Sequence, residues 1–278
     1  MKYRFISFYL LLHFLLLGKA SFTQVYYSLT DSLLKPNHVR LKTMITMDGH
    51  LAERWSYDKN GNLTKHINYY PVDSLPMMST ELEYDSDNRL SKSNTDVLEG
   101  YKDKKIMVDI LGQWLIGSHI DFKRDSLGKL TEELHTGRTS HSETESMYSV
   151  SYDYTPNGRK IKKTVKALNG IIRDQWVYNE TATENMVTQT TYDPTGKKIR
   201  TQVTYYEKAD IISRIVNDES ITTYQNSYDK KGQLVKTVRQ NNTGKTAFQF
   251  SYLPNGLLEK ITSSKSAPET ARFEYQYY

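Results

Sequence analysis

Apolar and polar side chains alternate one by one through long stretches of this sequence. The segment AFQFSY at residues 247–252 places Phe248, Phe250 and Tyr252 on one face and small or polar side chains on the other. The segment RFEYQYY at 272–278 does the same. A two-residue period is typical of β-strands with one buried face. Helical spacing is scarce, with one short helical turn expected over 28–34, so we predict an all-β protein.

A seven-residue frame recurs between the alternating segments, at 57–63, 84–90, 124–130, 154–160, 192–198, 228–234 and 252–258. Its first residue is Tyr in six of the seven copies, its second Asp in five, its fifth Gly in six and Asn in the other, and its seventh Leu in five. The residues that carry the pattern at the first, second and fifth positions are Tyr57, Asp58, Gly61, Tyr84, Asp85, Asn88, Asp125, Gly128, Tyr154, Gly158, Tyr192, Asp193, Gly196, Tyr228, Asp229, Gly232, Tyr252 and Gly256.

Each position of the frame has a physical reason in a β-hairpin turn. A type I turn followed by one left-handed residue requires Gly or Asn at that residue. An Asp at the start of the turn accepts hydrogen bonds from backbone N–H groups two residues on. Pro156, Pro194 and Pro254 occupy the next position, where a fixed φ suits a type I turn. The Tyr and Leu that flank the turn are expected to meet across the hairpin, so every frame predicts a hairpin turn.

The spacing of the frames predicts an antiparallel meander of repeated hairpins. The segments 70–76, 168–170 and 241–244 supply turns at the opposite end of the strands, and 47–50 starts an earlier hairpin. We expect about 14–16 strands in one long, twisted, curled sheet, because open sheets of that size curl or split. The expected domain division is a signal peptide over 1–20, a lead-in segment over 21–46 and the hairpin repeat domain over 47–278.

Three further segments carry structural expectations. The apolar stretch at 106–117 is expected to form either a buried hairpin or an edge that awaits a partner. The polar stretch at 135–146 is expected to form a long solvated loop. The last strand, over 271–278, would have an unpaired edge, and this motivates the hypothesis that it captures a partner by strand addition.

The frames YDKNGNL, YDKKGQL and YDSDNRL resemble the YD repeat of the RHS family. The resemblance covers about residues 47–278 and implies antiparallel β-ribbons, which large members coil into shells around a toxin or present at cell surfaces. This chain has a longer and less regular period than the family, and its seven frames are few for a closed shell. The resemblance therefore implies a small secreted bacterial relative.

The first twenty residues have the layout of a secretory signal peptide. Lys2 and Arg4 precede an apolar run over 5–17, and Gly18 and Ala20 are small residues at the −3 and −1 positions of an expected cut after Ala20. The apolar run is shorter than the roughly 20 residues that a bilayer-spanning helix needs. We expect a secreted, periplasmic or cell-surface protein of a bacterium, with no membrane span after signal cleavage.

Composition excludes several classes of function. The sequence contains no cysteine, which removes thiol nucleophiles, thiolate metal sites and disulfide chemistry. The formal charge of +5 includes Lys2, Arg4 and Lys19, and without them 34 basic residues face 32 acidic ones. A nearly neutral chain with both signs of charge mixed lacks the excess of basic residues that nucleic-acid binding requires.

No catalytic, cofactor-binding or metal-binding motif is present. His135 and His141 lie near Glu143 and Glu145 but lack the spacing of a metal site. The segment TGKT at 243–246 lacks the earlier glycine of a phosphate-binding loop. We therefore expect no enzymatic activity, no cofactor and no metal. Three tryptophans are weak candidates for a ligand-binding surface: Trp55, Trp114 and Trp176.

These observations favour an exported, non-enzymatic β-repeat protein that acts as a cell-envelope scaffold or as a binding module for a glycan or protein. One alternative is an outer-membrane β-barrel, since such barrels are exported and consist of alternating strands. The polar residues Arg272, Glu274 and Gln276, at positions that would face lipid, and a mean hydropathy of −0.66 oppose it. The other alternative is a glycan-active hydrolase, which would require paired carboxylates in a cleft.

Overall fold

The fold is an all-β meander in a computed structural model that describes residues 31–70, 74–104, 107–108, 114–139, 145–180, 185–208, 211–264 and 270–278. The elements in chain order are η1 (Asp31–Leu33), β1 (Val39–Thr46), β2 (Leu51–Tyr57), β3 (Leu63–Tyr69), β4 (Pro76–Tyr84), β5 (Leu90–Val97), η2 (Glu99–Lys104), β6 (Met107–Val108), β7 (Trp114–Leu115), β8 (Gly117–Arg124), β9 (Leu130–Arg138), β10 (Glu145–Tyr154), β11 (Lys160–Ala167), β12 (Ile172–Glu180), β13 (Asn185–Tyr192), β14 (Lys198–Lys208), β15 (Ile211–Asn217), β16 (Ile221–Tyr228), β17 (Leu234–Asn241), β18 (Gly244–Tyr252), β19 (Leu258–Ser263) and β20 (Ala271–Tyr277), where η marks a 3-10 helix.

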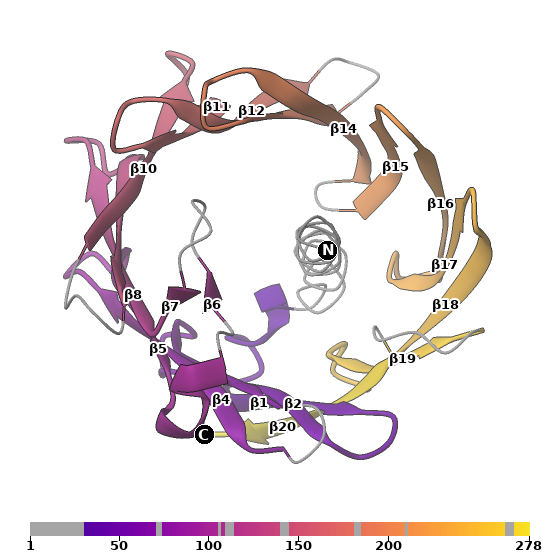
Figure 1. The fold of residues 1–278 in the computed structure, drawn as a ribbon. Coiled ribbons are helices and arrows are strands. Elements are labelled where there is room, and N and C mark those ends of the chain that lie inside the picture. The colour runs from indigo at the N-terminus through magenta and orange to yellow at the C-terminus, as the bar shows by residue number, and fades with distance from the viewer. Residues whose placement is uncertain are drawn as a thin grey trace, which may run out of the picture.

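The main sheet has 18 strands and closes on itself. Strand β1 pairs with β2 on one side and with β20 on the other, through seven residue pairs that include Met44↔Phe273. Figure 1 shows the resulting ring, with the last strand beside the first. The prediction of an all-β antiparallel meander is confirmed. The predictions of an open, curled sheet and of 14–16 strands are wrong.

Closure also removes the edge on which the strand-addition hypothesis depended. The last strand, β20, pairs with β1 along one edge and with β19 along part of its other edge. Unpaired strand edges attract other chains, and a barrel removes them altogether. The premise of partner capture at 271–278, an end strand left unpaired, is therefore wrong, because β20 pairs with β1. The strand that closes the ring lies at 39–46, within the segment that we expected to be a lead-in.

The seven frames form hairpin turns as predicted. Their fifth residues all have positive φ, from 62° at Asn88 to 86° at Gly158. In the first frame Asp58 Oδ1 accepts the N–H groups of Asn60 at 2.8 Å and of Asn62 at 2.9 Å. Tyr57 pairs with Leu63 across this hairpin, with a shift in register one step before the turn. Local chemistry thus accounts for the turns.

The frame tyrosines make a further contact that the pattern did not predict. The hydroxyls of three of them, and that of Tyr275 in β20, donate to the main-chain carbonyl of the residue that ends the preceding frame, which lies in the neighbouring hairpin. We call these bonds frame staples: Tyr84 to Leu63 at 2.8 Å, Tyr154 to Leu130 at 2.7 Å, Tyr252 to Leu234 at 2.7 Å, and Tyr275 of β20 to Leu258 at 2.7 Å.

Arg124, which replaces the frame tyrosine, serves the same carbonyl position. Its Nη2 donates to the carbonyl of Leu90 at 3.0 Å. The staples lie where the backbone ladder between adjacent hairpins ends; the ladder between β17 and β18, for example, stops at Lys236↔Gln249, short of the stapled carbonyl of Leu234. The frame therefore forms its own turn and also links that hairpin to the previous one.

The inner face of the ring can be identified from η1, the indigo element that lies inside it in Figure 1. Leu34, which follows η1, is buried with Tyr57, and Trp55 packs against the same cluster. Trp55 and Tyr57 therefore point inward. Directly paired residues share a face of a sheet, so the inner face continues around the ring through Trp55, His66, Thr80, Thr95, Ser118 and Gly137.

The outer face is rich in charged side chains. Lys65 pairs with Glu81 across β3 and β4 at 2.8 Å, and Lys123 pairs with Glu132 across β8 and β9 at 2.8 Å. Each of these residues neighbours an inward residue in its own strand, so it points outward. The ring has a largely polar exterior and keeps most of its aromatic residues inside.

The hydrophobic core lies on the inner face at one side of the ring. We call it the packed wall, and its buried members are Met44, Tyr224, Leu234, Phe248, Phe250, Leu258, Ile261, Ala271 and Phe273. Phe248, Leu258 and Ile261 are 0% exposed. These residues come from β1 and β16–β20, and they hold together the part of the ring that contains the closing seam.

The short strands β6 and β7 form a separate two-stranded sheet. They lie inside the ring in Figure 1, close to β5 and β8, and Leu115 of β7 is buried. The described part of 106–117 therefore fits the buried hairpin and not the edge strand.

Candidate functional site

The inner face opposite the packed wall carries ionisable and aromatic side chains in place of a hydrophobic core. We call this surface the charged wall, and it consists of Glu133, His135, Tyr152, Lys160, Lys163 and Trp176. Its strands β9–β12 are successive neighbours in the sheet. Lys163 pairs directly with Tyr152 on one side and Trp176 on the other. All three therefore share one face of the sheet.

This face points inward. Gly137 is an inner residue of β9, and His135 lies two positions before it in the same strand. His135 pairs with Tyr148, and Tyr148 pairs with Ala167 of β11, which lies four residues from Lys163. Because side chains two or four positions apart in a strand share a face, the charged wall belongs to the interior of the ring.

Glu133 is held at the centre of the charged wall. Its Oε2 lies 2.8 Å from His135 Nε2, and its Oε1 accepts a hydrogen bond from the hydroxyl of Tyr152. Burial alone would raise the pKa of Glu133, but the bonds from His135 and Tyr152 and the charge of Lys163 lower it. Glu133 is therefore an anion with both oxygens occupied.

Two lysine ammonium groups lie over the aromatic rings. Lys163 Nζ is 5.0 Å from the ring centroid of Trp176 and 5.9 Å from that of Tyr152. Lys160 Nζ is 5.4 Å from the centroid of Tyr152 and 5.0 Å from that of Tyr178. Burial, followed by the charge of Lys163, lowers the pKa of Lys160. Cation–π attraction thus holds both ammonium groups against the wall.

A second carboxylate on this face, Asp174, is also occupied by neighbouring side chains. Its Oδ1 accepts hydrogen bonds from Thr191 Oγ1 at 2.7 Å and from Gln189 Nε2 at 3.2 Å. Burial raises the pKa of Asp174 in spite of these bonds. Burial and the hydrogen bond to Glu133 raise the pKa of Tyr152. The raised pKa makes Tyr152 a poor acid and the lowered pKa makes Glu133 a weak base, so the arrangement suits binding better than proton transfer.

The three candidate tryptophans have different surroundings. Trp176 is half-buried on the charged wall. Trp55 lies on β2, where it stacks on His66 with ring centroids 5.2 Å apart and also packs against the cluster around Leu34. The side chain of Trp114 lies outside the described part of the structure. Of the two tryptophans whose side chains the structure describes, Trp176 is the one that lies on the charged wall, beside Lys163.

We expected His135 to lie in a polar loop, and this prediction is wrong. His135 belongs to β9, is 8% exposed and stacks on Tyr148 with ring centroids 4.2 Å apart. Its two-residue spacing from Glu133 was a signal that both side chains share a strand face. His141 lies outside the described residues. Among the residues that the structure does describe, no group of three or more His, Asp or Glu side chains could hold a metal ion.

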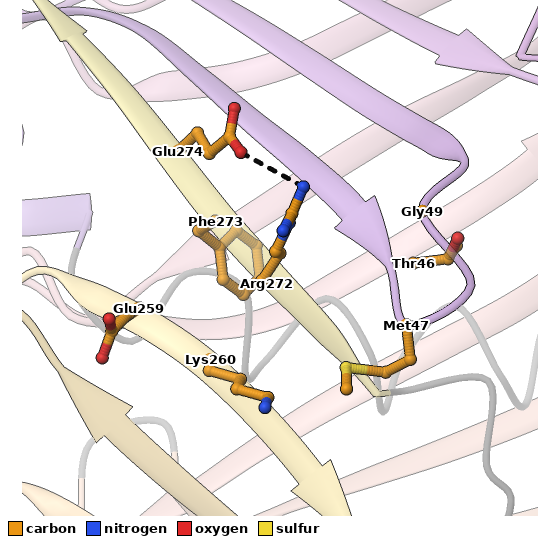
Figure 2. A pocket seen from close by; sticks show the side chains of 8 residues that line it. All are labelled: Thr46, Met47, Gly49, Glu259, Lys260, Arg272, Phe273 and Glu274. Carbon is orange, nitrogen blue, oxygen red and sulfur yellow. Dashed lines mark ion pairs between the residues drawn. The ribbon is translucent and has the colours of Figure 1, made fainter.

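A hollow of about 420 Å³ lies beside the closing seam, between β19, β20 and the β1–β2 turn. Figure 2 shows the charged side chains of Lys260, Arg272 and Glu274 around it, and Arg272 Nη2 lies 3.5 Å from Glu274 Oε1. The ladder between β19 and β20 has only two residue pairs, which leaves this space in the wall. The three charged residues point outward, so the hollow does not belong to the charged wall.

No helix in the described part of the chain is long and apolar enough to cross a membrane.

The comparisons with known proteins give only structural neighbours. No family model matches the sequence. No curated protein matches it either. A porin-like protein from Bacteroides uniformis has a TM-score of 0.45 at 11% identity, over 87% of this chain and 98% of the other. A porin-like protein from Bacteroides vulgatus has a TM-score of 0.33 at 14% identity, over 86% of this chain and 98% of the other.

A structure of TcdB2-TccC3-Cdc42 matches 83% of this chain at 12% identity, with a TM-score of 0.18, but only 18% of its own chain is covered. None of these scores reaches one half, so they carry no conclusion about function. The resemblance to the RHS family stays a prediction. What the structure itself establishes is a closed, 18-stranded antiparallel barrel.

Proposed function

We propose that the protein is an exported barrel of the bacterial cell envelope that binds a saccharide against the charged wall. The observation that carries the proposal is the inward placement of Trp176, Tyr152 and Lys163 beside one another. Aromatic rings with a few converging polar groups are the usual lining of a small-molecule site. Half-buried rings and ammonium donors match the apolar faces and the hydroxyl groups of a sugar.

Closure of the ring favours binding in the interior over the open scaffold that the sequence suggested. An open ribbon would offer its edge strands to a partner, whereas β1 and β20 pair with each other. The outer face carries ion-paired lysines and carboxylates such as Lys65 and Glu81. Exposed charged pairs of this kind are ordinary solvated surface, so the inner face is the better candidate for recognition.

Glycan binding by the exported protein, measured on an array and then by titration calorimetry, tests this proposal. Replacement of Trp176 by Ala should weaken binding at least tenfold, which corresponds to about 1.4 kcal/mol. The matched control is Tyr205→Ala, because Tyr205 lies on the outer face, where Arg214 covers its ring at 3.9 Å. Absence of glycan binding by the unaltered protein, or an equal loss in both variants, would contradict the proposal.

A second candidate function is an outer-membrane barrel, and the closed ring favours it over the open scaffold. Bacterial outer-membrane barrels are antiparallel and have an even number of strands, as this 18-stranded ring does. The outer face opposes this candidate, because a Lys or Arg that faces lipid near the midplane costs about 2–4 kcal/mol. Arg54 and Arg214 hold such outward positions at the middle of β2 and β15.

Membrane extraction separates the two candidates. A barrel that spans the outer membrane should stay in the washed membrane fraction until detergent is added, and it should conduct ions in a planar bilayer. The envelope barrel that we propose should be released by salt or alkaline washing without detergent. Recovery only in detergent, together with bilayer conductance, would favour the membrane barrel.

A further inference from the structure

The charged wall contains two ammonium groups that make no direct ion pair with the described residues. No ion-pair partner lies within 4.0 Å of Lys160 or Lys163 in the described part of the chain, and each ammonium instead lies over aromatic rings. The outer-face lysines differ, since Lys65 and Lys123 each contact a carboxylate at 2.8 Å. The two inner lysines are therefore charged groups with N–H donors to spare.

The nearby carboxylates are already occupied. Both oxygens of Glu133 are taken, by His135 and by Tyr152. Asp174 accepts from Thr191 and Gln189 through one oxygen. Neither carboxylate contacts a lysine ammonium at ion-pair distance, although the charge of Glu133 does act on both lysines at longer range. The surface therefore keeps two ammonium donors without a direct carboxylate partner, and both oxygens of Glu133 are already taken.

The two ammonium groups are also close enough to act on one ligand. Both lie within 6 Å of the same ring centroid, that of Tyr152, at 5.4 Å for Lys160 and 5.9 Å for Lys163. The charge of Lys163 lowers the pKa of Lys160, so the two ammonium groups repel each other, and an anion between them would remove this cost. The rings of Trp176 and Tyr178 lie 5.0 Å from one ammonium each and extend the surface on the far side.

We propose that the saccharide bound at the charged wall is acidic, with a carboxylate that lies between Lys160 and Lys163 and a sugar ring that stacks on Trp176. This inference rests on the proposed function and adds the chemical class of the ligand. Lysine is a compact point charge that is suited to a carboxylate. A neutral sugar would leave both ammonium groups unpaired, so discrimination against it should come from the two lysines, while Trp176 should contribute equally to acidic and neutral ligands.

The test uses an array that carries uronate-containing oligosaccharides beside the same oligosaccharides with their carboxylates reduced to alcohols. The unaltered protein should bind the acidic member of a pair at least tenfold more tightly, and the preference should shrink as salt is raised. Lys163→Gln and Lys160→Gln should each remove most of the preference. Lys65→Gln, on the outer face, is the matched control and should leave it unchanged.

Each outcome decides between the two proposals. Equal binding of acidic and reduced sugars overturns the acidic-ligand inference and leaves saccharide binding intact. A preference for acidic sugars that survives in both lysine variants also overturns the inference. Absence of binding to any sugar overturns the proposed function and this inference together. Lys163→Arg and Lys160→Arg keep the charge and should retain the preference, which separates charge from folding effects; circular dichroism confirms the fold of each variant.

Discussion

The packed wall and the charged wall are built from the same hairpin repeat but differ in the side chains that the repeat carries inward. On the packed wall, Phe248 and Ile261 are fully buried and pack with other apolar residues. On the charged wall, Glu133 and Lys163 occupy equivalent inward positions. The same turns, bulges and tyrosine staples serve both walls, as Tyr252 and Tyr154 show.

This difference teaches that the repeat specifies the backbone and leaves the inner strand positions open to variation. On the packed wall, the inward strand positions hold the apolar residues of a core, which stabilises the closing seam. The charged wall uses them for partly buried ionisable groups, which stabilise less because burial of charge is costly. Functional sites commonly have this character. The following predictions separate the two walls by stability and are given from the largest effect to the smallest.

Replacement of Phe248 by Ala on the packed wall should destabilise the protein by about 3–5 kcal/mol, because it leaves a cavity in a fully buried cluster. Urea unfolding at pH 7 measures the change. Tyr277→Ala, in the same region but 45% exposed, is the control and should cost far less. A small effect of Phe248→Ala would show that the packed wall does not hold the ring together.

Replacement of Glu133 by Gln on the charged wall should cost about 1–3 kcal/mol at pH 7, since hydrogen bonds to a buried charge are lost. The lowered pKa of Glu133 means that its contribution is present above the ordinary carboxyl pKa and is lost as pH falls through the folded-state pKa. The variant should therefore lose less stability on acidification than the unaltered protein. Glu81→Gln, whose side chain is 63% exposed, should change little at either pH.

Replacement of Tyr252 by Phe should remove one staple and cost about 1 kcal/mol, the usual net value of a hydrogen bond. Burial, followed by the charge of Asp229, raises the pKa of Tyr252 to about 12. The stabilising contribution is complete below the ordinary phenol pKa of 10.0 and is lost as pH rises toward about 12. Chemical unfolding at pH 8 and pH 11 should show the difference between variant and parent shrinking at the higher pH.

Replacement of Thr155 by Asp, in the turn between β10 and β11, should stabilise the protein by about 0.5 kcal/mol. Thr155 Oγ1 accepts only the N–H of Arg159, at 3.1 Å, among the turn amides. The aspartate of another frame, Asp125, accepts the N–H groups of Leu127 and Lys129 at 2.9 Å each. Asp125→Thr is the reciprocal control and should destabilise by a similar amount in thermal unfolding.

Local sequence was enough to predict the turns and the strand type. Gly61 needs a left-handed conformation that few other residues adopt, and Asp58 satisfies backbone donors within its own turn. These interactions join residues no more than four positions apart, so they can be read without knowledge of the rest of the chain. The second role of the frame tyrosine was missed, because its hydroxyl bonds to a neighbouring hairpin.

The first strand was missed for a related reason. Lys42 breaks the apolar alternation of β1, yet it is 2% exposed and lies 5.0 Å from the ring of Trp55 and 5.4 Å from that of Phe273. A lysine at an inner position is acceptable only beside such rings, which come from β2 and β20. Without those partners, residues 39–46 do not look like a barrel strand.

The candidate site was only partly predictable. Trp176 was singled out because tryptophan is uncommon in a sheet of mixed polarity, but Glu133, Lys160 and Lys163 looked like ordinary polar strand residues. Strand alternation shows that a sheet has two faces and does not say which one is inside. The packing of Leu34 against Tyr57, inside the ring, settles that question for this protein.

The order of residues dictated where this chain turns and which side chains share a strand face, because turn chemistry and β-pleating act over a few positions. Whether the ribbon would end in open edges depended on contact between β1 and β20, which lie more than two hundred residues apart. That contact closed the ring, so that the aromatic face and the charged wall of β9–β12 came to lie in its interior. No local pattern encodes these outcomes, since each depends on pairing and packing between distant segments.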